Sequence, residues 1–322
     1  MKERAPKDVA ASARQRLLNL SRQEGRAFNQ ILQFYAIEGF LRRLAATPWV
    51  GSLVVKGATM LRVWNAPLAR PTRDIDFLGY LPNDPERVVV IVRDCLAAPG
   101  QTDGLHFEQD IAAQPVMVED RYPGVRVGLR GHLSGATFRL QLDVAVDDVA
   151  VPEPGWVTYP TLLEGDGPRI LAYAPSTAIA EKLEAIISLG EATSRMKDFY
   201  DVWLLATTMD LDGETCAQSV RATFAHRGTG LPSSTPAVLT DDFARRPETD
   251  RQWRSFLKKA GVAPQPGLDR VLELLRMFFM PIAQARPEDT FGQHWPRGGP
   301  WKPRQDEVAS SDSSSTFHQH TL

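Results

Sequence analysis

The sequence predicts an α/β protein, with a mixed sheet flanked by helices and a helical C-terminal part. Three patterns support this prediction. Short apolar runs alternate with helical periodicity in residues 51–97, a strand-rich stretch follows at 105–149, and apolar residues recur at spacings of three and four through most of 176–284. Strands and helices that alternate along the chain favour an α/β architecture, and 322 residues are enough for one or two domains.

Residues 1–50 are predicted to form helices that pack on the core. Apolar side chains in 8–47 recur every three or four residues, and Pro48 closes this stretch. The core itself is predicted to span 51–168. Its first elements are expected to be a strand at 51–55, a helix at 57–66, a strand at 74–79 and a helix at 85–97.

The clearest strand of the predicted core is TFRLQLDVAV, residues 137–146, in which apolar and polar residues alternate. Side chains two apart in a strand point to the same face. We therefore expect Asp143 on the more polar face of a half-buried strand. A connection rich in proline and glycine, 152–168, ends this part of the chain.

The C-terminal domain, 169–285, is predicted to be helical. Its helices are expected at 176–189, 194–209, 213–226, 238–260 and 268–284. Residues 286–322 are rich in proline, glycine, serine and aspartate and lack periodicity, which is typical of a disordered tail.

Composition narrows the class of protein. Hydrophobic residues make up 43% of the chain and charged residues 24%, as in soluble globular proteins. The chain has no apolar run that could cross a bilayer, and its N-terminus lacks the apolar region of a secretory signal. We therefore expect a cytoplasmic protein with no membrane partner. The net charge of −2 predicts no general attraction to nucleic acid, although arginines cluster locally.

Three aspartates form the first candidate site. Asp74 and Asp76 lie two apart in a predicted strand, so both are expected on one face. Adjacent carboxylates repel each other unless a cation lies between them, and Mg²⁺ favours such ligands and usually binds substrate phosphates too. If the strand of Asp143 pairs beside them, the three carboxylates would suit one or two Mg²⁺ ions. The alternative is that Asp74 forms a turn or pairs with Arg70 or Arg73, and that Asp143 is merely solvated.

Three residues near this strand are candidates for binding phosphate. Lys56 and Gly57 lie at a strand-to-helix junction, where a helix N-terminus attracts anions and glycine lets the backbone approach closely. Thr72 follows Pro71, and its hydroxyl and the turn amides could hold phosphate oxygens. The alternatives are a solvated lysine beside a turn glycine and a simple turn-forming threonine.

The helical part contains a second group of charged candidates. Lys182 interrupts the apolar stripe of its predicted helix, and such local inconsistencies are often functional, although a lysine can also extend its charge to solvent. Asp198 and Asp201 lie three apart on one helix face. Arg195 and Lys197 add positive charge at the positive end of that helix, which is more easily explained if they face a phosphate.

These segments resemble the AbiEii/AbiGii toxin family of bacterial nucleotidyltransferases. The order KGATML, RPTRDIDF, a strand aspartate, AEKLEAI and RMKDFYDVWLL is similar to the hallmark of that family, over roughly residues 30–210. Two positions depart from the pattern. Ala58 replaces the second glycine of K-G-G, and Pro71-Thr72 stands where classical nucleotidyltransferases have a G-S pair.

The resemblance implies a polymerase-β-like nucleotidyltransferase core, in which Asp74 and Asp76 bind Mg²⁺. Lys182 would contact the nucleoside triphosphate, and Asp198 would be the essential acid of the K-D motif. The resemblance also implies the toxin of a type IV toxin–antitoxin or abortive-infection system. Its substrate would be an NTP, its acceptor the 3′ end of tRNA, and its antitoxin the product of an adjacent gene. The further nucleotide-binding candidates are Lys56, Gly57, Thr72, Arg73, Arg195, Lys197 and Asp201.

The predicted reaction is metal-dependent nucleotidyl transfer, with Asp143 as a further Mg²⁺ ligand or as a general base. Positioning and charge neutralisation supply most of the catalysis in such chemistry. Three alternatives remain open at this point. The enzyme could modify a protein or a small molecule, it could be a metal-dependent nuclease, or the chain could bind nucleotides without catalysis.

Overall fold

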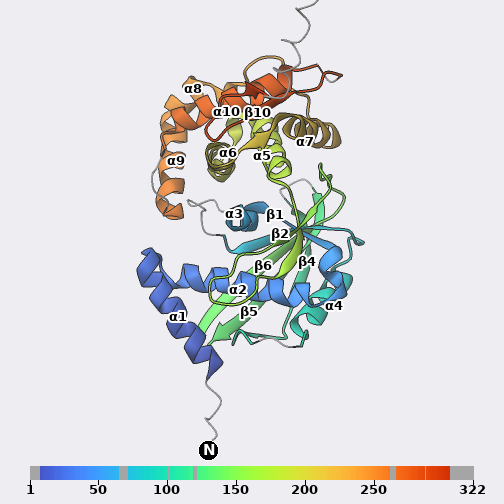
Figure 1. Cartoon of the computed structure of the whole chain (residues 1–322), viewed down its shortest axis with the longest axis vertical. Helices are drawn as coiled ribbons and strands as arrows, with labels where there is room; N and C mark the ends of the chain where they lie inside the picture. Colours follow the sequence, from blue (N-terminus) through green and yellow to red (C-terminus); the bar gives the residue numbers. More distant parts are fainter. Residues whose placement is uncertain are drawn as a thin grey trace, which may run out of the picture. The chain divides into compact units, whose positions relative to one another are not determined.

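The computed structural model describes residues 8–64, 72–99, 102–118, 122–261, 266–286 and 288–304. The chain divides into two compact units. The first, which we call the sheet unit, comprises residues 1–149 and 153–174. The second, the helical unit, comprises residues 150–152 and 175–322. Figure 1 shows the elements of each unit.

The sheet unit is built on one mixed sheet, which has eight strands within the described residues. Seven of them lie in the order β3-β5-β6-β2-β1-β8-β7, and β4 pairs with β5. The strands are β1 (Leu53–Lys56), β2 (Asp74–Gly79), β3 (His106–Phe107), β4 (Ala112–Val118), β5 (Tyr122–Leu133), β6 (Ala136–Ala145), β7 (Gly155–Thr158) and β8 (Arg169–Ala172).

Helices α1 (Val9–Glu24), α2 (Phe28–Ala45) and α4 (Pro85–Leu96) pack on one face of this sheet (Figure 1). Gly25, at φ 64°, ends α1 in the left-handed conformation that glycine favours. Asp84 caps α4 by accepting from the amide of Glu86 at 3.0 Å. The predicted N-terminal helices are thus present, and they bury an apolar core against the sheet.

The register of β2 places its two aspartates away from that core. Ile75 and Phe77 are buried in the core cluster, whereas Asp74 and Asp76 are partly exposed on the other face. β2 runs parallel to β6 and antiparallel to β1. Asp76 is consequently paired in register with Asp143 on one side and with Lys56 on the other.

The segment after β1 differs from the single helix predicted at 57–66. A 3-10 turn, Gly57–Thr59, leads into one short turn of helix, α3 (Met60–Val63). Gly57 adopts φ 69°, which is incompatible with the interior of a right-handed helix. Residues 65–71, which include Arg70 and Pro71, lie outside the described residues.

The helical unit contains six α-helices within the described residues, α5 to α10. Their bounds are α5 (Pro175–Leu189), α6 (Met196–Thr208), α7 (Gly213–His226), α8 (Asp241–Arg245), α9 (Pro247–Ala260) and α10 (Leu268–Gln284). The helix predicted at 238–260 is divided, because Arg246 is extended and Pro247 starts a new helix. α10 packs against α6, α7 and α8, and α5 against α6 and α7.

The prediction of a disordered tail from 286 is wrong for residues 288–304. Strand β9 (Leu211–Asp212) pairs with β10 (Gln293–Trp295), which pairs with β11 (Lys302–Pro303). Trp295 is fully buried, and its indole donates to the carbonyl of Ala206 at 2.7 Å. The aromatic residues of this segment therefore fasten it to the helices. Residues 305–322 lie outside the described residues.

The predicted fold class is confirmed: a mixed sheet is flanked by helices, and a helical C-terminal region follows. Within the described part of the chain, no helix combines the length and the apolar character that a membrane span requires.

Candidate functional site

The first candidate site is a group of carboxylates on the sheet face opposite the helices. Residues in register across neighbouring strands point to the same face, so Asp76 and Asp143 lie side by side. Asp74 pairs in register with Gln141, two residues before Asp143. The structure thus brings together the three aspartates that the sequence predicts for a metal site.

Arg126 of β5 completes this group, and the sequence prediction missed it. It is in register with Asp143 and binds it through two hydrogen bonds, in which Nε donates to Oδ1 and Nη2 to Oδ2, each at 2.8 Å. Gln141 also donates to Oδ2 of Asp143, at 3.0 Å. The hydrogen bonds to Asp143 raise the pKa of Arg126, and the charges of Asp143, Asp74 and Asp76 raise it further. The alternation of Val125, Arg126 and Val127 was the sequence pattern that could have placed Arg126 on this face of the sheet.

Gly57 makes room for one of these carboxylates. A Cβ atom at this position would lie 2.0 Å from Oδ2 of Asp76, and the φ of 69° already favours glycine. The close approach of the backbone expected at Gly57 is therefore an approach to Asp76.

Thr72 and Arg73 lie just before the carboxylates. The hydroxyl of Thr72 donates to the carbonyl of Asp74 at 3.1 Å, and Thr59 donates to the same carbonyl at 3.3 Å. Gln33 of α2 holds the backbone here by donating to the carbonyl of Arg73 at 3.1 Å. The side chain of Thr72 thus shapes the turn that leads into Asp74, and Arg73 is exposed.

Lys56 is held inside the sheet unit. Its side chain is 2% exposed, and its Nζ lies 3.1 Å from Oδ2 of the buried Asp148. Nζ also lies 5.3 Å from the ring centre of Tyr173, which is within reach of a cation–π interaction. These contacts give Lys56 a structural role at the end of β1, and its predicted role toward phosphate stays a prediction.

The candidates of the helical unit form a second cluster. Nζ of Lys182, on α5, lies 3.3 Å from Oδ1 of Asp198 and 3.0 Å from Oδ2 of Asp201, both on α6. Nε of Arg195 lies 2.7 Å from Oδ2 of Asp198. Both carboxylates are buried, whereas Lys182 and Arg195 remain partly exposed, and Lys197 is exposed. Four of the five predicted residues are therefore joined in one network.

A further buried network on α5 escaped the sequence prediction. Arg227 lies 3.3 Å from Glu181 and 3.1 Å from Glu184, and the hydroxyl of Thr229 donates to Glu184 at 2.5 Å. Removing one partner of such a pair leaves a buried charge uncompensated, which destabilises the fold. This network connects α5 to the end of α7, which fixes the helix that carries Lys182.

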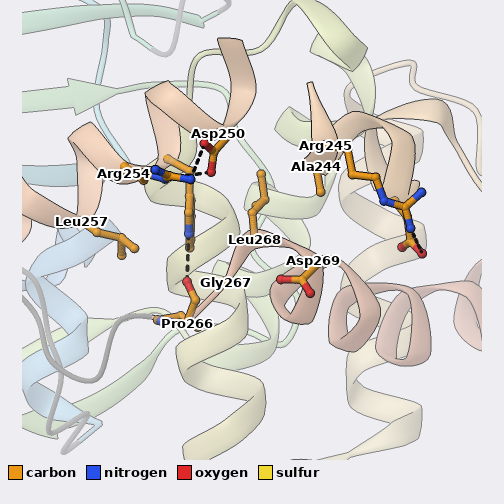
Figure 2. A pocket seen from close by; sticks show the side chains of 11 residues that line it. Ala244, Arg245, Asp250, Arg254, Leu257, Pro266, Gly267, Leu268 and Asp269 are labelled. Carbon is orange, nitrogen blue, oxygen red and sulfur yellow. Dashed lines mark hydrogen bonds and ion pairs between the residues drawn. The ribbon is translucent and has the colours of Figure 1, made fainter. Parts of the chain in front are cut away.

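The helical unit also has a pocket, of about 600 Å³, lined by parts of α8, α9 and the start of α10 (Figure 2). It contains none of the predicted site residues. Two of its arginines are paired with neighbouring carboxylates: Arg254 lies 2.7 Å from Asp250, and Arg245 lies 3.4 Å from Asp242. Its Trp253 is buried and donates to the carbonyl of Pro266.

The chemistry of the sheet site suits a hard divalent cation, because such ions prefer carboxylate oxygens. Asp74 and Asp76 present their carboxylates on a rigid strand, and Asp143 lies in register. Among the residues that the structure describes, no group of three or more His, Cys, Asp or Glu side chains is already arranged to hold a metal. Both oxygens of Asp143 are engaged by Arg126.

Comparison with known proteins finds a matching family and similar solved structures, two of which are from Helicobacter pylori. The family model described as "Nucleotidyl transferase AbiEii toxin, Type IV TA system" matches residues 39–274. A candidate nucleotidyltransferase from H. pylori is 17% identical, with 80% of this chain and 93% of that chain covered and a TM-score of 0.43. JHP933 from Helicobacter pylori is also 17% identical, with 77% and 87% covered and a TM-score of 0.42. Among curated proteins, none matches.

Proposed function

Because this chain belongs to the AbiEii family of nucleotidyltransferase toxins from type IV toxin–antitoxin systems, we propose that it transfers a nucleoside monophosphate from an NTP to the 3′ end of tRNA, with Mg²⁺ as its metal ion. The observation that carries the proposal is the register of β2 with β6, which sets Asp76 beside Asp143 and both near Asp74. Membership of the family also implies an antitoxin partner, and such enzymes generally use divalent metal ions.

In the sheet unit, Asp74 and Asp76 would hold Mg²⁺, with Asp143 as a further ligand. A bound Mg²⁺ supplies charge neutralisation for the triphosphate. Ile75 and Phe77 anchor β2 in the core, so the strand positions its aspartates before any ligand arrives. If Asp143 acts as a general base instead, it would accept the proton of the acceptor hydroxyl through one of its oxygens.

In the helical unit, we assign Lys182 and Arg195 to phosphate binding. Both side chains are partly exposed, and both are aimed by buried carboxylates on α6. Asp198 and Asp201 would thereby fix the direction of two cations without reaching the phosphates themselves. This arrangement holds two cationic hydrogen-bond donors in fixed positions, and preorganised donors of this kind lower the barrier of phosphoryl transfer.

The choice of tRNA follows from the family resemblance, so the experiment must test the acceptor separately. Purified protein is incubated with each labelled NTP and Mg²⁺, and with total tRNA, protein extract or small metabolites. We expect label on tRNA, and only when both Mg²⁺ and tRNA are present. Label on protein or metabolites would instead assign another acceptor, and cleavage of RNA without an NTP would indicate a nuclease.

The matched variants are Asp76→Asn and Asp110→Asn. Asp110 is an exposed aspartate of the same unit, so its variant makes the same chemical change away from the carboxylate group. We expect Asp76→Asn to abolish labelling and the growth defect on expression, while Asp110→Asn retains both. Equal labelling by the two variants would remove the catalytic role of Asp76.

A further inference from the structure

Arg126 occupies the place of a cation in the carboxylate group. Its guanidinium binds both oxygens of Asp143 at 2.8 Å, in the fork geometry that is the strongest form of this pair. Asp143 is nearly buried, whereas Arg126 is 39% exposed. The guanidinium of Arg126 can therefore separate from Asp143 and move into solvent, while the carboxylate of Asp143 stays in place on its strand.

The second observation is the charge of the surroundings. Asp74 and Asp76 also act on Arg126 electrostatically, so its positive charge lies among three carboxylates. Removing that charge would make this face of the sheet more negative and would favour a metal ion. Arg126 thus does part of what a divalent cation would do at this site.

We propose that Arg126 competes with the divalent metal ion for Asp143, and so keeps the affinity of the site for free metal low. The inference rests on the proposed metal site at Asp74, Asp76 and Asp143. As a consequence, the metal ion binds at this site as a complex with the NTP, whose phosphates supply further ligands, and the free ion binds only weakly. Arg126 is a positioning residue in this account, since it acts through Asp143.

The test measures the binding of free Mn²⁺ by electron paramagnetic resonance, with no nucleotide present. We expect Arg126→Gln to bind Mn²⁺ about tenfold more tightly than the wild type, because a repelling charge and a competitor are both removed. Arg126→Lys keeps the charge but loses the fork, so its affinity should fall between the two. Thermal unfolding of each variant checks that it is folded.

Two controls sharpen the result. Arg130→Gln removes an exposed arginine from the same face of β5, and its affinity should equal that of the wild type. Adding Asp143→Asn to Arg126→Gln should remove the gain, which assigns the gain to this aspartate. Equal or weaker binding by Arg126→Gln would overturn the inference even if the wild type transfers nucleotides. If no variant binds Mn²⁺, the inference and the proposed metal site both fail.

Discussion

At the scale of single residues, the contact between Gly57 and Asp76 is the sharpest constraint on the sheet site. Gly57→Ala would place a methyl group on the carboxylate of Asp76. We expect transfer to fall about a hundredfold, because small displacements of reacting groups have effects of that size. The strain of a positive φ should also lower the free energy of unfolding, by about 1–3 kcal/mol.

Gly135→Ala is the matched control for this prediction. Gly135 has φ 82° in the hairpin between β5 and β6, and a Cβ there would meet no atom within 4 Å. It should therefore share the loss of stability but keep its activity. Activities are measured by nucleotide transfer and stabilities by urea unfolding, and equal activity losses in the two variants would contradict the assigned contact.

The Lys182 cluster leads to a second prediction at this scale. Asp198→Asn removes the charge that faces both Lys182 and Arg195. Breaking a buried ion pair typically lowers the free energy of unfolding by about 3–5 kcal/mol, and the partial exposure of these cations places this variant at the lower end. Lys197→Gln, at an exposed neighbour, should unfold like the wild type. Unchanged urea unfolding of Asp198→Asn would show that the cluster adds little stability.

The sequence predicted the aspartates because their spacing reports directly on a strand face. It did not reveal that Arg126 faces Asp143, or that Lys56 pairs with Asp148, since both pairings depend on tertiary position. The partner of Arg126 is set by the hairpin of β5 and β6, and that of Lys56 by a loop after β6. Alternation within one strand shows which face a side chain occupies, but it does not identify the partner on the next strand or in a loop.

At the scale of elements, β10 shows how a short strand can be held by its side chains. Trp295 is fully buried, with its ring centre 5.0 Å from that of Phe278 and 5.2 Å from that of Trp301. We expect Trp295→Ala to lower the free energy of unfolding by about 3–5 kcal/mol. Trp156→Ala removes an indole that is 48% exposed, and it should cost much less. Similar urea midpoints for both variants would contradict the packing described.

Elements with a regular period were predicted closely. β2 was expected at 74–79 and is Asp74–Gly79, and α10 was expected at 268–284 and is Leu268–Gln284. β10 and β11 have three and two residues, too few to show a period. Their order comes from the buried Trp295 and from contacts such as the ion pair of Arg304 with Asp212. Composition alone therefore indicated disorder where the structure has an anchored segment.

At the scale of the whole molecule, two buried cysteine thiols predict how the free energy of unfolding depends on pH. Burial raises the pKa of the Cys95 thiol from 9.0 to about 11 and that of Cys216 to about 12. Above pH 9 the unfolded chain loses these protons while the folded protein keeps them. The free energy of unfolding should therefore fall as pH rises from about 9 toward 12.

This prediction is checked by urea unfolding at pH 8 and pH 10.5. The decrease between the two values should be smaller in Cys216→Ala, which has one buried thiol fewer. The burial of both cysteines also means that a thiol reagent should label the folded protein only after denaturant is added. Rapid labelling of native protein, or stability that rises with pH over this range, would contradict the assigned burial.

The parallel pairing of β2 with β6 also affects when the site comes into existence during folding. The two strands are far apart in the sequence, and β3, β4 and β5 lie between them along the chain. Contacts between distant residues form late, because the intervening chain must be ordered first. A chain that ends before β6 would therefore contain the Asp74–Asp76 motif without its partner Asp143. We expect the carboxylate group to form only after β6 has been made and has paired with β2.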